Sequence, residues 1–139
     1  MRVLLDAFAV IALLGEEPAA DEVESLLRRG EAAITAINLA EALDVLQRIQ
    51  GISPERLGSL IGPLVRESLT LLPVDEQMAY DAGDIRARHY HRTRTPVSLA
   101  DCVLVAAART ADALATADGP LIRVARLEGV GVRELPRGS

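Results

Sequence analysis

The chain has 139 residues, half of them hydrophobic, and a formal net charge of −5, which fits one domain with a single core. All fifteen of its cations are Arg, so the absence of Lys excludes a Walker A loop and Schiff-base chemistry. The negative net charge argues against non-specific coating of nucleic acid but allows a local basic patch. Cys102 is the only cysteine, which excludes an internal disulfide and favours a cytoplasmic location.

The first half of the chain is predicted to alternate strands and helices. Residues 2–6 form a short apolar strand that ends in an acid, and a helix follows up to Gly15. No apolar run approaches the ~20 residues of a membrane span, and a secretory signal is not expected because Asp6 interrupts the first run. Residues 19–30 read as a helix and 32–35 as a strand. Asn38 is expected to open the next helix, whose apolar stripe is Leu39, Leu43, Leu46 and Ile49.

The second half continues this alternation. Ser53 and Pro54 have the residue types that cap and start a helix, and residues 69–74 form a strand ended by Pro73. Asp75 is expected to cap a helix that runs to about Tyr90. A helix with no polar face carries Asp101, which predicts a central position in the fold. Strands are expected at residues 113–116 and, at an edge of the sheet, within 129–135.

This order of elements predicts an α/β domain in which helices cover both faces of a parallel sheet, giving three layers. The sequence shows no internal repeat or linker. We therefore expect one domain over residues 1–135, and we interpret residues 136–139, "PRGS", as a tag or linker remnant without a structural role.

Four acids stand at positions that each have a simple structural explanation. Asp6 can cap the helix after the first strand, and Glu41 can lie on a solvated helix face. Asp101 follows Ser98 at the spacing of a capping box, and Asp118 begins an Asp-Gly turn. Each explanation is adequate while its residue is considered alone.

The four positions also share an edge of the predicted sheet. Asp6 and Asp118 end strands, whereas Glu41 and Asp101 lie near the starts of helices, and ligands of parallel α/β sheets bind at this edge. Four carboxylates without a Lys to offset them favour a hard divalent cation held by oxygen ligands. The pattern therefore predicts an Mg²⁺ or Mn²⁺ site formed by Asp6, Glu41, Asp101 and Asp118.

Four segments resemble, in order, the sequence blocks of PIN-domain ribonucleases: "VLLDAFAVIALL", "TAINLAEALDVL", "SLADCVLVAAA" and "ALATADGPL". The chain is most similar to the VapC-type toxins of toxin–antitoxin pairs. Matched block by block, the acidic metal-site positions of the family fall on the same four acids, and Thr116 matches a small hydroxyl residue before the last one.

The resemblance implies a five-stranded parallel sheet, a homodimer, divalent-metal-dependent cleavage of RNA, and inhibition by a cognate VapB-type antitoxin. Two departures stand out. Many relatives have Ser or Asn where this chain has Phe8, and many have a further acid where it has Gly119-Pro120. The second departure leaves a smaller acidic set.

A run of cations within "IRARHYHRTRT" is a candidate RNA-binding surface, made of Arg86, Arg88, Arg92 and Arg94. Arg binds phosphate in a bidentate way, and Tyr90 could stack on a base. The alternative is a helix end whose cations complement the helix dipole.

These features are compatible with three functions. The first is a metal-dependent endoribonuclease in which Asp6, Asp101 and Asp118 hold the cation, Glu41 completes the site, and Ser98 and Thr116 support it. The second, a phosphoryl-transfer or receiver-type domain, is disfavoured by the absence of Lys. The third is a catalytically degenerate PIN-like interaction module, for which exposed apolar residues could form a partner groove; the candidates are Leu13, Leu14, Leu26 and Leu27.

Overall fold

A five-stranded parallel sheet forms the centre of the molecule. The structure is a computed structural model and describes residues 1–138. The strands are β1 (Val3–Leu5), β2 (Ala32–Thr35), β3 (Thr70–Leu72), β4 (Ala113–Thr116) and β5 (Val132–Glu134), in the order β3-β2-β1-β4-β5. The predicted strands and the predicted edge position of the last one are confirmed.

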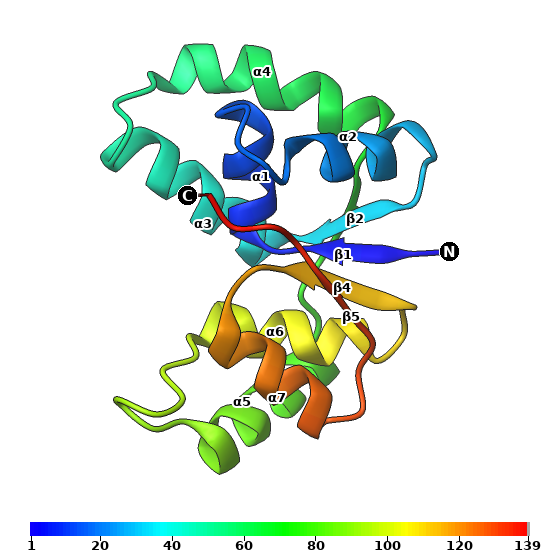
Figure 1. The fold of residues 1–139 in the computed structure, drawn as a ribbon, viewed down its shortest axis with the longest axis vertical. Helices are drawn as coiled ribbons and strands as arrows, with labels where there is room; N and C mark the ends of the chain where they lie inside the picture. The colour runs from blue at the N-terminus through cyan, green and yellow to red at the C-terminus, as the bar shows by residue number, and fades with distance from the viewer. Residues whose placement is uncertain (139) are drawn as a thin grey trace.

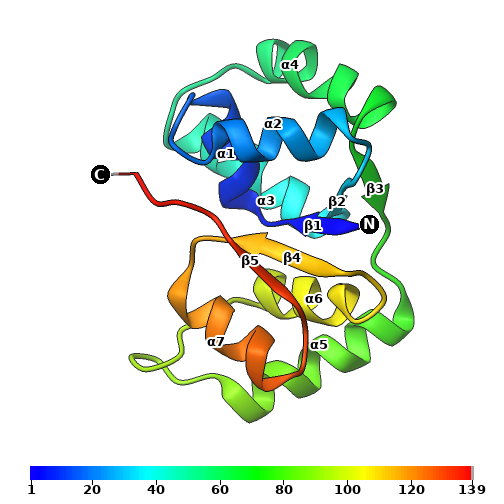
Figure 2. The same cartoon turned by 45° about the vertical axis from the view of Figure 1, so that its right-hand side comes forward.

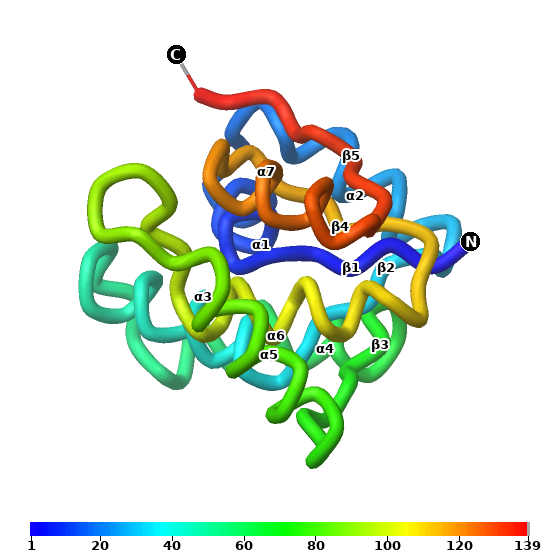
Figure 3. The backbone as a smooth tube through the Cα atoms, turned by 90° about the horizontal axis from the view of Figure 1, so that it is seen from below, coloured from blue at the N-terminus to red at the C-terminus, as the bar shows by residue number. Residues whose placement is uncertain are grey.

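Seven helices cover the two faces of this sheet (Figure 1). On one face lie α1 (Ala7–Leu14), α2 (Ala20–Arg28), α3 (Ala36–Arg48) and α4 (Pro54–Glu67). On the other lie α5 (Glu76–His89), α6 (Leu99–Ala108) and α7 (Gly119–Leu127), which are nearest the viewer in Figure 3. The predicted three-layer α/β/α class is therefore confirmed.

Alternation along the short strands separates two cores. Leu5 and Ile34 point into the core beneath α1 to α4, whereas their neighbours Leu4 and Ala33 point into the core beneath α5 to α7. Successive side chains of a strand face opposite sides of the sheet, so even three-residue strands serve both cores. The predicted central position of α6 is confirmed, since all its residues from Cys102 to Ala108 are buried.

The direction of the strand order reverses at β1, because the chain moves from β1 outward to β2 and β3 and then returns to β4 on the other side (Figure 2). In open parallel sheets this reversal opens a crevice at the carboxyl ends of the two central strands. The segments that follow β1 and β4 begin at Asp6 and Ala117. The fold thus predicts a ligand site between these two strand ends.

Three details differ from the sequence-based expectations. Helix α3 begins at Ala36, because the Thr35 hydroxyl accepts a hydrogen bond from the Asn38 amide and so caps the helix two residues earlier than expected. The apolar stripe stops before Ile49, which is 65% exposed. Leu26 and Leu27 are buried in the core and cannot line an exposed partner groove.

No helix formed by residues 1–138 combines the length and the apolar character needed to cross a membrane.

Candidate functional site

Asp6 lies at the centre of the carboxyl edge of the sheet, immediately after β1. It caps α1, since its Oδ1 accepts a hydrogen bond from the Ala9 amide at 2.9 Å. Its Oδ2 accepts a hydrogen bond from the Thr116 hydroxyl at 2.5 Å. The residue is 5% exposed, so a carboxylate is held in a nearly dry position by two donors from different segments. The simple capping explanation is correct and does not exclude a second role.

Thr116 connects Asp6 and Asp118 through hydrogen bonds of its hydroxyl group. This buried residue ends β4, and its hydroxyl oxygen accepts a hydrogen bond from the Asp118 amide at 3.0 Å while donating to Asp6. Asp118 in turn caps α7 through a 3.0 Å bond from the Leu121 amide to Oδ2. One threonine hydroxyl therefore sets the spacing between the acids that follow the two central strands.

Asp101 and Ser98 form the predicted capping box at the start of α6. The Asp101 amide donates to the Ser98 hydroxyl and the Ser98 amide donates to Asp101 Oδ2, both at 3.0 Å. The box fixes the side chain of a half-buried aspartate at the head of a buried helix. This bond occupies only one of its two oxygens among the hydrogen bonds within residues 1–138.

Glu41 lies in the second turn of α3, because that helix begins at Ala36. The fully buried Asn38, one turn earlier, donates from Nδ2 to the Ala100 carbonyl at 3.3 Å and hydrogen-bonds to Thr35. This contact connects the start of α3 with the start of α6. Sequence reasoning missed Asn38; its signal was an amide three residues after a capping Thr, on a helix face that packs inward.

The four acids influence one another electrostatically. The pKa of Asp6 is raised to about 7, chiefly by burial and in smaller part by the charges of Asp101 and Asp118, despite the two hydrogen bonds that favour its charged form. Burial likewise raises the pKa of Asp101, with a contribution from the Asp118 charge. Burial and the charge of Asp101 raise the pKa of Glu41. We call Asp6, Glu41, Asp101 and Asp118 the acidic cluster.

The donor chemistry of the acidic cluster fits a hard divalent cation. Within residues 1–138, hydrogen bonds occupy one oxygen of Asp101, one oxygen of Asp118 and neither oxygen of Glu41. No Arg or His of this part of the chain forms an ion pair with any of the four. Mg²⁺ and Mn²⁺ prefer such oxygen ligands and keep several bound waters. The carboxylates around such an ion therefore do not all need to contact it directly.

The acidic cluster is not a closed metal cage. Across residues 1–138, no group of three or more acid, His or Cys side chains stands together as a metal-binding set. A cation would therefore be held with waters between it and part of the ligands, or would draw the carboxylates together when it binds.

The four candidate RNA-binding arginines do not form one surface. Arg88 contacts Glu128 at 2.7 Å and Asp84 at 2.9 Å, so its charge is used within the protein. Arg86 donates from Nε to the Val97 carbonyl at 3.0 Å and lies 4.1 Å from the centre of the Tyr90 ring.

Arg92 and Arg94, in contrast, are exposed in the loop between α5 and α6 and form no ion pair within residues 1–138. That loop projects on the same side of the molecule as the carboxyl ends of the strands (Figures 1 and 2).

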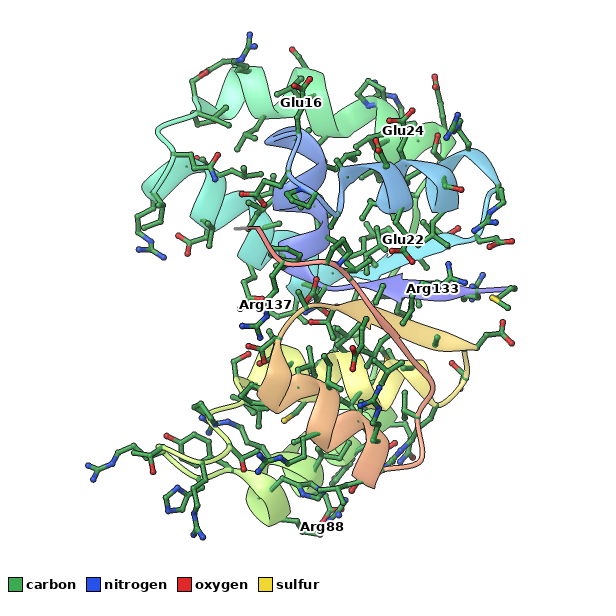
Figure 4. All side chains as sticks on the ribbon, in the orientation of Figure 1. Glu16, Glu22, Glu24, Arg88, Arg133 and Arg137 are labelled. Atoms are coloured by element: carbon green, nitrogen blue, oxygen red, sulfur yellow. The ribbon has the colours of Figure 1, made fainter. Side chains whose placement is uncertain are left out.

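The C-terminal segment returns to the acidic cluster. The Leu135 amide donates to the Thr116 carbonyl at 2.8 Å, and Arg137 Nε donates to the Ala117 carbonyl at 2.8 Å. Figure 4 shows the Arg137 side chain beside the start of α7. A tag or linker origin of residues 136–139 stays a prediction, but within these residues Arg137 has a defined contact that sequence reasoning did not anticipate.

Comparison with known proteins agrees with this architecture. Residues 3–127 match the model of the PIN domain family, "PIN domain". No curated protein matches the chain.

Among solved structures, the DNA-bound VapBC complex from Salmonella typhimurium aligns with a TM-score of 0.71 at 20% identity, covering 96% of this chain and 98% of that one. The VapBC2 complex from Rickettsia felis, bound to a promoter DNA fragment, aligns with a TM-score of 0.68 at 15% identity over 98% and 100% of the two chains.

FitAcB from Neisseria gonorrhoeae aligns with a TM-score of 0.61 at 21% identity, covering 94% of this chain and 95% of that one. At these identities the structural matches show the fold. The family match spans most of the chain and includes all four acids, and the resemblance inferred from the four sequence blocks is confirmed. The chain belongs to the PIN domain family.

Proposed function

We propose that this protein is an Mg²⁺- or Mn²⁺-dependent endoribonuclease that cleaves RNA phosphodiester bonds, and that it acts as a toxin neutralised by a cognate VapB-type antitoxin. The observation that carries the proposal is the acidic cluster: four coupled carboxylates at the crevice of a parallel sheet, without a cation of residues 1–138 among them. Members of the PIN family are in general metal-dependent nucleases, which supports the same reaction class.

The acidic cluster has two kinds of role in this proposal. Asp6, Asp101 and Asp118 would hold the divalent cation, and Glu41 would complete its surroundings or orient the attacking water. The chemistry that bound Mg²⁺ or Mn²⁺ supplies is charge neutralisation at the scissile phosphate and activation of water.

Two further residues position these carboxylates. Thr116 orients Asp6 through its 2.5 Å hydrogen bond, and Ser98 orients Asp101 through the capping box.

RNA binding is assigned to the cations that have no partner within the described chain. Arg92 and Arg94 are the members of the predicted set that meet this condition, whereas the ion pairs of Arg88 argue against a direct role for it. We retain Arg86 as a residue that supports the loop through its bond to Val97.

The proposed assembly is a homodimer that binds an antitoxin in the cytoplasm. The antitoxin is supported by the toxin–antitoxin complexes among the structural matches. The dimer is supported by an apolar hollow of about 400 Å³, whose exposed rim includes Ile37, Val74 and Leu99. Sedimentation analysis measures the assembly directly.

The experiment that tests the nuclease compares purified wild-type protein with Asp101→Asn on labelled RNA in Mg²⁺ or Mn²⁺. Asn keeps the size of the side chain and can still accept the Ser98 amide, so the fold should persist. We expect a loss of cleavage of more than about 100-fold, since changes in residues that merely support metal ligands already cost ~10–100-fold. Excess EDTA should have the same effect on the wild type.

Glu134→Gln is the matched control, because it removes one acid from an exposed ion pair with Arg126. It should cleave RNA like the wild type. Undiminished cleavage by Asp101→Asn, or by the wild type in EDTA, contradicts the proposal.

A second candidate is a catalytically degenerate PIN-like interaction module. It is favoured by the absence of a preassembled metal group within residues 1–138 and by Phe8 near the acidic cluster. Expression of the protein alone separates the two: growth arrest that persists in Asp6→Asn indicates action by binding, and arrest that disappears indicates catalysis.

A further inference from the structure

A cavity beside the acidic cluster combines an aromatic ring with a cation. Its volume is about 360 Å³, and it is lined by Phe8 of α1, Ala117 and Asp118 of the loop after β4, and Arg137 of the C-terminal segment. Its size lies at the low end of the ~300–1,000 Å³ typical of small-ligand sites. Because Asp118 is both a wall of the cavity and a member of the acidic cluster, a ligand here would be adjacent to the proposed reaction centre.

Arg137 is anchored so that part of its guanidinium remains available. Nε is bonded to the Ala117 carbonyl, and the backbone is fixed two residues earlier by Leu135, which is 4% exposed. A Cβ built on Gly119 would lie 3.7 Å from Arg137 Nη2, so this nitrogen extends along the bare backbone at the start of α7. Arg137 forms no ion pair with a carboxylate of residues 1–138, and its terminal nitrogens can donate to an anion.

Phe8 gives the cavity an apolar aromatic wall, in contrast to the cationic side chain of Arg137. It is the only Phe of the chain, stands in the first turn of α1, and is half-buried against the core of that face, which leaves part of its ring on the cavity. The backbone beneath it is fixed by the Asp6 cap. Nucleobases stack on such rings whatever their identity, because every base has a π-face.

The acidic cluster repels a polyanion, so a nucleic acid that reaches it needs a nearby cation. Arg88 is committed to Glu128 and Asp84, and Arg86 to Val97. Arg137 is the cation that lines the cavity bordered by Asp118. A phosphate bound by its guanidinium would be held next to the carboxylates without displacing a cation from them.

We propose that this cavity is a nucleotide subsite for single-stranded RNA, in which one base stacks on Phe8 while the adjoining phosphate is bound by Arg137. The inference rests on the proposed ribonuclease function and names the contacts of the nucleotide next to the cleavage site. It assigns a role to Phe8, the position at which many PIN-domain relatives carry Ser or Asn. It also assigns a role to Arg137, which lies beyond the matched family segment, and so treats this residue as part of the protein and not as a tag or linker remnant.

The test measures binding without cleavage. Fluorescence anisotropy of a labelled, mixed-sequence single-stranded RNA is recorded in excess EDTA over a series of salt concentrations. Phe8→Ala should weaken binding roughly 5- to 100-fold, the loss expected for one stacked base. Arg137→Ala should weaken binding and reduce the salt slope by about one phosphate contact.

Matched variants separate these contacts from general effects. Phe8→Leu keeps the apolar packing but removes the stacking ring, so it should bind as weakly as Phe8→Ala. Arg137→Lys should keep the salt slope but lose affinity, since Lys cannot bind phosphate with two nitrogens. Arg28→Ala removes an equal charge at the end of α2, which lies at the other edge of the sheet, and should match the wild type.

Each outcome bears on the inference separately from the reaction. Wild-type affinity of Phe8→Ala and Arg137→Ala overturns it, even if the protein cleaves RNA. Tighter binding or faster cleavage by Arg137→Ala also overturns it, because Arg137 would then block the site. If the wild type binds no RNA the inference fails, whereas the expected losses of affinity support it even if cleavage is never detected.

Discussion

Asp6 and Glu128 are both carboxylates with little exposure to solvent, but the chain surrounds them with opposite charges. Asp6 is 5% exposed, and its charged neighbours are Asp101 and Asp118. The Glu128 side chain is 8% exposed and contacts Arg88, His89 and Arg109, each at 2.7 Å. The pKa of Asp6 is consequently raised to about 7 by burial, whereas that of Glu128 is lowered to about 2, chiefly by its hydrogen bond with Arg88.

Burial alone therefore does not indicate the role of an acid in this fold, whereas the charges of its neighbours do. Glu128 is neutralised within the protein and links the ends of α5, α6 and α7. Asp6 accepts two hydrogen bonds that favour its charged form, but it has no counter-ion within residues 1–138, so its negative charge is not neutralised by this part of the chain. The first arrangement links three helix ends within the fold, and the second is the one that we expect of the proposed metal site.

The largest effect expected from this comparison is on the pH dependence of stability without metal. Because the folded state raises the pKa of Asp6 from 3.8 to about 7, Asp6 contributes stability below pH ~4 that is lost as the pH rises through 7. Unfolding by urea in EDTA should show a decrease on the order of 3 kcal/mol over this window. The contribution of Glu128 to stability changes with pH in the opposite direction. It is present above the unfolded pKa of 4.5 and is lost as the pH falls towards 2.

In Asp6→Asn the free energy of unfolding should depend much less on pH between pH 4 and 7. The pH dependence that remains comes from the smaller contributions of Asp101 and Glu41, whose pKa values are also raised. Asp21→Asn, at an exposed position of α2, is the control and should keep the wild-type profile. A wild-type profile in Asp6→Asn would show that Asp6 does not carry an uncompensated charge.

The next effect concerns Glu128 itself. Glu128→Gln removes the negative charge that pairs with Arg88 and Arg109 and contacts His89, and it should lower the free energy of unfolding at pH 7 by about 2 kcal/mol, measured in urea. Glu134→Gln, which disrupts the exposed 2.9 Å pair with Arg126, should cost less than about 1 kcal/mol. Equal losses in the two variants would remove the distinction between a neutralised and a surface acid.

The smallest effect is stabilisation by the cation. Mg²⁺ or Mn²⁺ at about ten times its dissociation constant should raise the free energy of unfolding by about 1.4 kcal/mol, because it binds only the folded state. Thermal unfolding with and without EDTA measures this increment. Glu128→Gln should retain it and Asp101→Asn should lose most of it; an increment of equal size in Asp101→Asn would exclude the acidic cluster as the binding site.

Local sequence patterns predicted the parts of the site that depend on local geometry. Asp6 ends a strand and caps the helix after it, and Ser98 and Asp101 have the spacing of a capping box; both are confirmed. The edge that gathers these residues follows from the alternation of strands and helices. The apolar run after Asp101 also predicted the central position of α6 correctly.

Local sequence patterns could not predict contacts between segments that lie far apart in the chain. The Asn38–Ala100 bond spans 62 residues, and the Arg88–Glu128 pair spans 40. Such contacts depend on how helices pack across the sheet, which spacing along one helix does not specify. The four arginines of the candidate RNA surface share a sequence window but not their contacts, because Arg88 pairs with Glu128 after α7 and Arg86 donates to Val97. Their role in RNA binding stays a prediction.

Three members of the acidic cluster also begin helices: Asp6 for α1, Asp101 within the box of α6, and Asp118 for α7. An alanine scan would therefore report two losses at once, since removing a capping side chain costs ~1 kcal/mol whatever happens to catalysis. Asparagine accepts the same amide protons while discarding the negative charge. For this protein the choice of replacement decides whether mutagenesis measures chemistry or folding.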